Sequence, residues 1–265
     1  MKTHPWADDP ERAPLVDTTV INPFIDEAVA ARYARARPSL HHHVVRLLAE
    51  RLPRPRHALD IGCGTGLSTQ PLTSFADIVV GFDESEAMLN RTAGDDEHYV
   101  RAVAERLPFR DGALELATIA SAIHWLDSDA IEEVGRVLIP QAHVAVYDVW
   151  FRAEMFGVHA FADWMSQVCA PRYPRVPRHE YEEGSMSVGR FLPMWEEDLQ
   201  FNIPMKLDQL VSYLMTHSER IAAVREGTET EAQQSAFLTE GLKPYFAEAD
   251  VRKLGFGIQI RVFGR

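Results

Sequence analysis

The first half of the chain alternates short apolar runs with segments that have the apolar spacing of helices. The apolar runs are typical of buried strands, and we expect strands at 57–61, 78–82, 98–103, 114–120 and 142–148. Two helices are expected before them, at 24–37 and 38–52, the second ended by Pro53. Alternation of this kind predicts an α/β fold, with a parallel sheet covered by helices on both faces.

The sequence ALDIGCGTGLST, at 58–69, leads from the first expected strand into a turn that contains three glycines. Gly62, Gly64 and Gly66 lack a Cβ where the backbone must turn sharply and lie against a ligand. A dinucleotide-binding turn has its third glycine one position later, where this chain has a leucine. The carboxylate of Asp60 would repel a pyrophosphate but attract an ammonium group. These features favour S-adenosylmethionine, whose methionine carries an ammonium group, over NAD.

A second acidic residue ends the second expected strand. Asp83 follows the apolar run IVVGF, roughly 20 residues past the glycine turn, where a carboxylate can accept both ribose hydroxyls of a nucleoside. Glu84, Ser85 and Met88 then open the next helix, and Met88 is placed to lie on the adenine face. An aspartate after a strand is also often a helix cap, so that alternative stays open for Asp83.

Four successive segments resemble the motifs of a known family. They are DIGCGTG, VVGFDESEAML, AERLPFRDGALELATIASAIHWLD and EEVGRVLIPQAHVAVYD, and they resemble those of class I S-adenosylmethionine-dependent methyltransferases of the type 11 group. Within that group, IHWLD and the later SYLMTHS at 212–218 resemble the trans-aconitate methyltransferase-like branch. The resemblance covers residues 25–150 and implies a Rossmann-like seven-stranded sheet, in which the seventh strand runs antiparallel between the fifth and the sixth.

The resemblance also implies roles for individual residues of a cofactor site. Asp60, Gly62 and Gly64 would hold the methionine end, Asp83 the ribose, and the backbone around Ala104 the adenine ring. The other cofactor-binding residues expected at the turn and the strand ends are Tyr33, Cys63, Thr65, Gly66, Glu84, Ser85, Met88, Glu105, Ser121 and Ala122.

One position departs from the family's pattern. Many relatives have an acidic residue that accepts a hydrogen bond from the adenine amino group, and this chain has Val103 there. Glu105 or a water molecule is then expected to make that contact. Tyr33 is expected to close over the methionine carboxylate, and Ser121 and Ala122 to border the transferable methyl group.

The chain divides into three expected parts. Residues 1–52 would form an N-terminal arm and entry helices, and 53–150 the cofactor-binding core. Residues 151–265 would supply a helical lid from inserts around strand six, with strands at 199–207 and 256–263 and helices across 208–246. Aromatic residues at helical spacing after Trp150 are more simply explained as the core of that lid than as a substrate pocket.

Composition narrows the class of protein. The 265 residues have 46% hydrophobic content and no apolar run long enough to span a bilayer, and the N-terminus lacks a signal-peptide layout, so we expect a cytoplasmic protein. The only cysteines are Cys63 and Cys169, which argues against a disulfide framework. The net charge of −12 argues against a nucleic-acid partner and favours a small-molecule acceptor.

His124 and Trp125 lie just past the fourth expected strand, where donor and acceptor would meet. His124 is the candidate general base for a hydroxyl acceptor, because an ordinary histidine titrates near neutral pH. A hydrogen bond to a loop carbonyl is the simpler role for it. Trp125 is a candidate substrate contact, with packing under the lid as the alternative.

Three arginines recur every third residue in PRYPRVPR. Arg172, Arg175 and Arg178 would share one edge of a polyproline II segment, and there they could hold an anionic acceptor. The alternative is a solvated loop whose arginines meet an acidic run at 180–183.

Consecutive histidines at 41–43 point about 100° apart on a helix, so they cannot share a metal ion, and we expect them to be surface or lid contacts. We expect no metal. The sequence therefore predicts an S-adenosylmethionine-dependent methyltransferase that acts on a small molecule, with O-methylation of a carboxylate or hydroxyl favoured. N- or C-methylation of a secondary metabolite and a catalytically silent binding subunit remain alternatives. The oligomeric state stays open.

Overall fold

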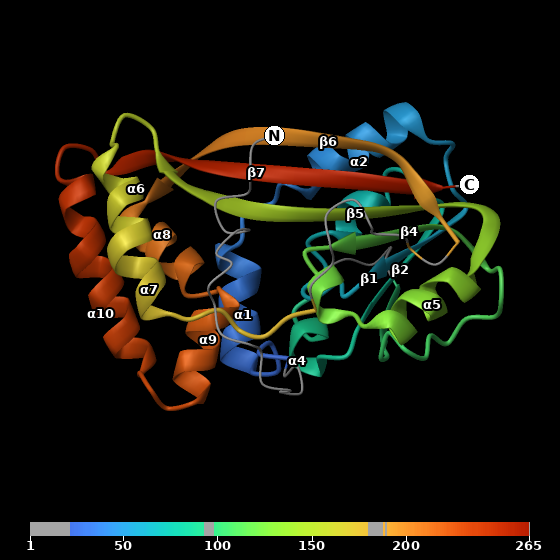
Figure 1. Cartoon of the computed structure of the whole chain (residues 1–265), viewed down its shortest axis with the longest axis horizontal. Coiled ribbons are helices and arrows are strands. Elements are labelled where there is room, and N and C mark those ends of the chain that lie inside the picture. The colour runs from blue at the N-terminus through green and yellow to red at the C-terminus, as the bar shows by residue number, and fades with distance from the viewer. Residues whose placement is uncertain (1–21, 93–97, 180–187, 189, 265) are drawn as a thin grey trace, which may run out of the picture.

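The computed structural model describes residues 22–92, 98–179, 188 and 190–264. Their central feature is one seven-stranded sheet with the order β3-β2-β1-β4-β5-β7-β6 (Figure 1). The expected arm at 1–21 and the acidic run at 180–183 lie outside the described residues.

The parallel part of the sheet forms the core half of the molecule. Its strands are β1 (His57–Ile61), β2 (Ile78–Asp83), β3 (His98–Arg101) and β4 (Leu114–Ala120), all paired in parallel. Between them lie α3 (Thr69–Leu72), α4 (Glu86–Leu89), the 3₁₀ turn η1 (Ile123–Trp125) and α5 (Ser128–Val137). Because β1 and β4 are almost fully buried on both faces, they consist of apolar residues with few exceptions. The expected strands in this half are confirmed.

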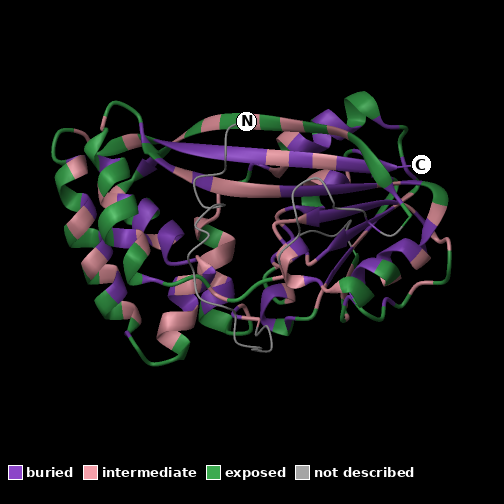
Figure 2. Cartoon of the chain, in the orientation of Figure 1, coloured by how far each residue is buried: buried purple, intermediate pink, exposed green. Residues whose placement is uncertain are grey.

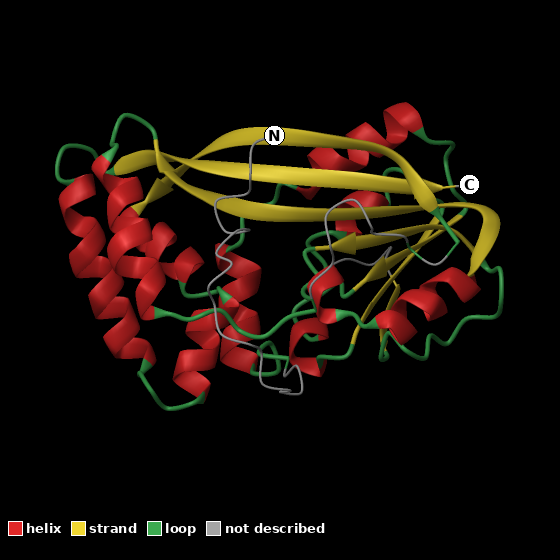
Figure 3. Ribbon diagram, in the orientation of Figure 1, coloured by secondary structure: helices red, strands yellow, loops and turns green. Residues whose placement is uncertain are grey.

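The other three strands are longer than the sequence suggested. β5 (Leu138–Met155), β7 (Val251–Gly264) and β6 (Leu192–Lys206) continue well past the core, and Figure 3 shows them as an arch that reaches the helices at the far end. β7 runs antiparallel to β5 on one side and to β6 on the other, which confirms the expected seventh-strand topology. The strands expected at 142–148, 199–207 and 256–263 were therefore too short.

Helices gather at the end of this arch. They are α6 (Ala160–Trp164), the π-helical turn η2 (Met165–Cys169), α7 (Ala170–Arg172), α8 (Leu207–Leu214), α9 (Ser218–Arg225), α10 (Glu231–Leu242) and the 3₁₀ turn η3 (Lys243–Phe246). Phe161 and Met165 are buried in the hydrophobic core that this part shares with the long strands. The aromatic spacing after Trp150 thus marks packing for Phe161, Trp164 and Met165, as its simpler explanation predicted, whereas Phe156 is 73% exposed.

Two N-terminal helices complete the molecule. α1 (Glu27–Ala36) is capped by Asp26, whose carboxylate accepts from the amides of Ala28 and Val29, and α2 (His41–Arg51) packs Val44 and Leu48 into the core. Figure 1 shows α1 between the core strands and the helical end. Figure 2 shows β7 almost wholly buried, whereas the edge strand β6 alternates between exposed and partly buried residues.

Among the described residues, no helix is both long and apolar enough to cross a membrane.

Candidate functional site

The glycine turn after β1 has the backbone conformation that only glycine adopts easily. Gly62, Gly64 and Gly66 have φ values of 64°, 56° and 79°. A Cβ on Gly62 would stand 2.7 Å from the Cβ of Ala122, so the turn lies directly against the residues that follow β4. A Cβ on Gly64 would meet the Met88 side chain at 3.7 Å. The turn, the end of β4 and α4 therefore meet at the carboxyl edge of the sheet.

Asp83, at the end of β2, faces this turn. Its Oδ2 accepts from the Gly64 amide at 2.9 Å and its Oδ1 from the Ser85 amide at 2.8 Å. Burial raises the pKa of this carboxyl, and the two amide hydrogen bonds act in the opposite direction. A carboxylate has about four lone-pair sites, so two remain after these bonds, which suits the two hydroxyls of a ribose. This geometry is compatible with the predicted role of Asp83 as a ribose ligand and also with the alternative, in which Asp83 only stabilises the local turn.

Asp60 has a different environment. Its side chain is 0% exposed, and its oxygens accept from the hydroxyls of Ser68 at 2.6 Å, Thr69 at 2.7 Å and Thr118 at 2.7 Å. The carboxylate thus ties the glycine turn to α3 and to β4. Direct contact between Asp60 and an ammonium group stays a prediction, since the structure shows Asp60 holding the protein around the turn.

The other predicted residues near the turn differ in burial, hydrogen bonding and backbone conformation. Thr65 is buried, and its hydroxyl has no hydrogen-bond partner among the described residues, although buried hydroxyls normally have one. Ser121 has a φ of 52°, a left-handed conformation that is uncommon for a serine and clusters at functional sites. Burial raises the pKa of the Cys63 thiol well above its ordinary value, so Cys63 is a packing residue and not a nucleophile. Ala104 is buried near this edge and Glu105 is exposed.

Phe24, which the sequence analysis did not single out, joins the two sides of the site. Its carbonyl accepts from the Ser85 hydroxyl at 2.6 Å, and its ring makes edge-to-face contacts with Tyr33 at 5.7 Å and Trp125 at 6.1 Å. α1 therefore places Tyr33 beside Phe24, and its contact with the methionine carboxylate stays a prediction. Nothing in the local sequence around Phe24 indicates this long-range role.

His124 and Trp125 lie in η1, immediately after β4. The His124 carbonyl accepts from the His179 amide at 3.0 Å, and the Arg178 guanidinium lies 5.4 Å from the centre of the Trp125 ring. Burial, with a smaller effect of Arg178, lowers the pKa of His124 to about 3. His124 is thus neutral at physiological pH, and the proline-rich segment covers it.

The three arginines of that segment do not share an edge. Arg172 belongs to α7 and pairs with Glu229, and its guanidinium also lies 4.4 Å from the Phe237 ring centre. Arg175 is exposed, and only Arg178 reaches the site. The polyproline II expectation was wrong because Arg172 is helical, and a helix turns its side chains differently from a three-residue repeat.

His41 needs a correction as well. Its Nδ1 lies 3.0 Å from the Tyr147 hydroxyl, and burial lowers its pKa to about 4, so it is an interior residue and not a surface contact. No group of three or more histidine, cysteine, aspartate or glutamate side chains in the described part of the chain could hold a metal ion. The absence of a metal remains a prediction.

Comparison with known proteins shows what the core half resembles. Residues 59–146 match the family described as "Methyltransferase domain". This segment of the chain is therefore similar to methyltransferase domains. A malonyl-[acyl-carrier protein] O-methyltransferase of Dechloromonas aromatica is 38% identical over 128 residues, 44% of this chain and 46% of that protein. An 18S rRNA (guanine-N(7))-methyltransferase of Mus musculus is 30% identical over 112 residues, 39% of this chain and 40% of that protein.

A solved structure, a putative type II methyltransferase from Anaeromyxobacter dehalogenans, shows the same fold. It superposes with a TM-score of 0.66 at 24% identity, over 84% of this chain and 95% of that one. The chain spans about half the length of the curated relatives it matches. The names of these relatives do not test the trans-aconitate-like branch, which stays a prediction.

S-adenosylmethionine is the cofactor of this family, and the residues of the methyltransferase domain fit it. The turn at Gly62, Gly64 and Gly66 leaves room for close approach, Asp83 keeps acceptor capacity for two hydroxyls, and the orphaned Thr65 hydroxyl lies beside them. The roles assigned to individual cofactor-binding residues remain predictions.

Proposed function

We propose that this chain transfers a methyl group from S-adenosylmethionine to an oxygen of a small molecule, a carboxylate or a hydroxyl. The single observation that carries the proposal is Asp83, a half-buried carboxylate at the end of β2 whose two amide hydrogen bonds fix it against the glycine turn. The match of residues 59–146 to a methyltransferase domain supports the same conclusion.

Methyl transfer requires the protein mainly to position the donor and the acceptor. Bound S-adenosylmethionine supplies an electrophilic methyl group on a sulfonium. The acceptor oxygen attacks in line, so alignment and the exclusion of water provide most of the rate enhancement. In this chain, Phe24, Tyr33 and Trp125 form an aromatic wall that restricts water, and His124 is neutral and able to take a proton from a hydroxyl acceptor.

A carboxylate is the acceptor that we favour. A carboxylate with an ordinary pKa near 4 is already ionised at neutral pH, so it needs no general base, and His124 with a pKa of about 3 is a weak one. The relative named as an O-methyltransferase of malonyl-[acyl-carrier protein] supports oxygen as the acceptor atom. The relative named as an rRNA methyltransferase keeps a nucleic-acid acceptor as the alternative, against which the net charge of −12 counts. The cytoplasmic location stays a prediction.

A labelling experiment separates these possibilities. The protein and methyl-labelled S-adenosylmethionine are incubated together in three separate reactions, which contain the small-molecule, the RNA or the protein fraction of a cell extract. We expect label in the small-molecule fraction, released as methanol by mild base, because methyl esters hydrolyse and methyl ethers or amines do not. Label in RNA would contradict a small-molecule acceptor. Binding of S-adenosylmethionine without transfer to any fraction would indicate a silent binding subunit.

A further inference from the structure

Two guanidinium groups near the methyl-transfer site are held by neutral oxygens. Arg37, between α1 and α2, donates from Nε to the Thr216 hydroxyl at 2.8 Å and from Nη2 to the Thr216 carbonyl at 3.0 Å. Arg178 donates from Nη2 to the Ser218 hydroxyl at 2.7 Å. In the part of the chain that the structure describes, neither arginine has an ion-pair partner. Hydrogen bonds to neutral oxygens therefore orient both guanidinium groups.

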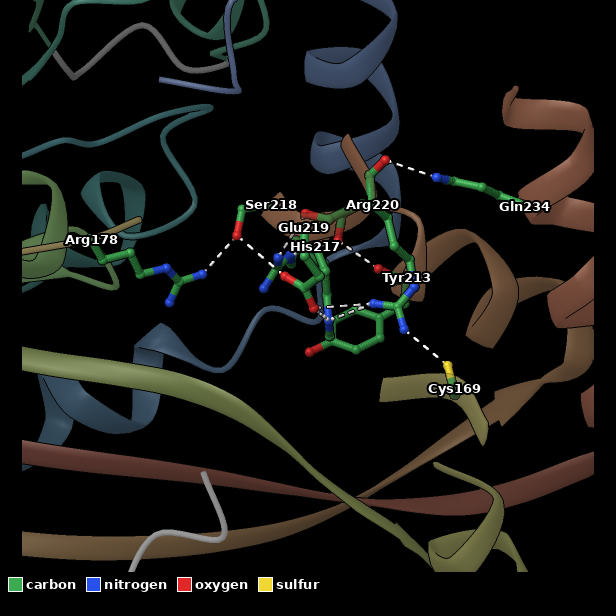
Figure 4. Close-up of polar contacts among 10 residues, drawn as sticks. Cys169, Arg178, Tyr213, His217, Ser218, Glu219, Arg220 and Gln234 are labelled. Carbon is green, nitrogen blue, oxygen red and sulfur yellow. Dashed lines mark hydrogen bonds and ion pairs between the residues drawn. The ribbon is translucent and has the colours of Figure 1, made fainter. Parts of the chain in front are cut away.

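The residues that orient them belong to a rigid, buried segment. Thr216 is 1% exposed and Ser218 is 4% exposed, at the junction of α8 and α9. Figure 4 shows Arg178 pointing toward Ser218 from the opposite side of the site. The segment lies within the SYLMTHS motif that the sequence analysis singled out, and the proposed methyl transfer does not otherwise explain it.

A polar network behind this junction fixes its position. Arg220, only 3% exposed, lies 3.3 Å from the Glu219 carboxylate and 3.2 Å from Nδ1 of His217. It also donates to the sulfur of Cys169 at 3.0 Å, and its carbonyl accepts from the Gln234 amide at 2.9 Å. The same network appears in Figure 4. Glu219 is thus engaged by Arg220, and the Ser218 hydroxyl stands between the Glu219 carboxylate and Arg178.

Both arginines border the place where donor and acceptor meet. Arg178 lies over the Trp125 ring and close enough to His124 to lower the pKa of that histidine. Arg37 lies 4.7 Å from the ring centre of Tyr33, which contacts Phe24 in the aromatic wall. The two guanidinium groups thus approach the acceptor side of the cofactor site from two different elements.

Charges of both signs surround Arg178. Burial lowers the pKa of Arg178, and the nearby charges of Arg175 and Arg37 act in the same direction, whereas Glu219 and Asp148 oppose them. Arg37, Arg175 and Arg178 together form a positive patch, and Arg178 is exposed, so this patch is accessible to an anion. The positive patch also stands out in a chain with a net charge of −12, because it is the kind of local field that attracts an anion.

We propose that Arg37 and Arg178 form the anion-binding part of the acceptor site, where they bind a carboxylate of a small acceptor, and that Thr216 and Ser218 position them. The inference rests on the proposed methyl transfer. Guanidinium groups suit this task because their planar donors match the geometry of a carboxylate. Arg172, which the sequence placed in the same role, is instead occupied by Glu229.

Binding of malonate, a small dicarboxylate, tests the proposal directly. Malonate is titrated calorimetrically into the wild type saturated with S-adenosylhomocysteine, and into Arg37→Ala, Arg178→Ala and Arg172→Ala. We expect the first two changes to weaken malonate by at least about tenfold, as for loss of a hydrogen bond to a charged group. Arg172→Ala, from the same segment, is the matched control and should bind malonate as the wild type does.

Further variants separate positioning from structure. Arg178→Lys keeps the charge but not the planar donors and should recover only part of the affinity. Ser218→Ala and Thr216→Val should weaken malonate less than loss of either arginine, and added salt should weaken binding by the wild type. Uncharged malonamide should not compete.

Three results would overturn the proposed anion-binding role of Arg37 and Arg178. They are no saturable malonate binding by the wild type, wild-type malonate affinity in Arg37→Ala and Arg178→Ala, or the same loss of affinity in Arg172→Ala. A selective loss of S-adenosylhomocysteine binding in Arg37→Ala or Arg178→Ala would also overturn it, by assigning these residues to the methionine carboxylate. The titration is repeated without S-adenosylhomocysteine, so that malonate binding is judged separately. Failure of the wild type to bind S-adenosylhomocysteine would instead contradict the proposed function.

Discussion

Two carboxylates flank the glycine turn, and their surroundings give them different tasks. Asp60 is enclosed by the hydroxyls of Ser68, Thr69 and Thr118, so its charge stabilises the protein around the turn. Asp83 accepts two amide hydrogen bonds and keeps acceptor capacity for a ligand. Residue type and spacing identified both positions, but the sequence could not show that three hydroxyls, one of them 58 residues away, donate to the first.

His124 provides a test at the scale of one residue. With a carboxylate acceptor, we expect His124→Gln to keep its kcat within about tenfold of the wild-type value, because no proton must be removed. Since the pKa of His124 is about 3, the wild-type rate should not fall as the pH is lowered through 6.5. The substitution should therefore leave this part of the pH profile unchanged. Steady-state kinetics across pH 5–9 measure both, with the exposed His42→Gln as control. A loss of about 10² or more would instead identify His124 as the base for a hydroxyl acceptor.

At the scale of elements, the glycine turn combines unusual backbone geometry with close packing. Gly62→Ala places a Cβ at a φ of 64° and 2.7 Å from the Cβ of Ala122. Gly227→Ala, at a φ of 72° with no atom within 4 Å, has the same kind of backbone strain without the collision. The strain should destabilise each variant by about 1–2 kcal/mol.

The collision should cost Gly62→Ala roughly a further 1–3 kcal/mol, as overpacking does. Chemical denaturation compares the two variants, and calorimetry should show weaker S-adenosylmethionine binding only for Gly62→Ala. Equal losses of stability in both would mean that the turn does not press against the end of β4.

The core elements could be predicted because their pattern is local. The first four strands are short and apolar, and their ends coincide with turn residues. The long strands could not be delimited in the same way, since Trp150 and Phe151 resemble lid residues in sequence although they continue β5. Their conformation depends on pairing with β7, where Phe151 lies opposite Phe256 across a large sequence separation.

The contacts of Arg178 escaped prediction for the same reason. Its repeat with Arg172 and Arg175 is visible in the sequence, but its acceptor, Ser218, lies 40 residues away on another element. Arg37 gives no local signal at all, because Thr216 is 179 residues distant. Sequence reasoning therefore singled out Arg178 but not Arg37.

At the scale of the whole molecule, half-buried histidines should make stability depend on pH. Burial lowers the pKa of His41 to about 4, of His124 to about 3 and of His217 to about 4, whereas in the unfolded chain a histidine titrates near 6.5. Between these values the unfolded state binds more protons, so the free energy of unfolding should rise with pH from about 4 to 6.5 and fall on acidification.

Denaturant unfolding at pH 7, 6 and 5 measures this slope. His217→Gln should reduce it by up to about 1.4 kcal/mol per pH unit, the equivalent of one proton. Glu219 acts at lower pH: Arg220 and His217 lower its pKa against the opposing effect of burial, so its stabilising effect is lost only as the pH falls below 4.5. Stability that is unchanged between pH 7 and pH 5 would contradict the half-buried, neutral state of these histidines.

The central claim is that the glycine turn and Asp83 form a binding site for S-adenosylmethionine. Isothermal titration of S-adenosylmethionine into the wild type and Asp83→Ala tests it most directly, with Asp111→Ala, an exposed carboxylate before β4, as the control. We expect Asp83→Ala to raise the Kd by about 10- to 100-fold, Asp111→Ala to leave it unchanged, and NAD not to bind. A correctly folded Asp83→Ala protein with the wild-type Kd, or NAD affinity comparable to that for S-adenosylmethionine, would contradict the account.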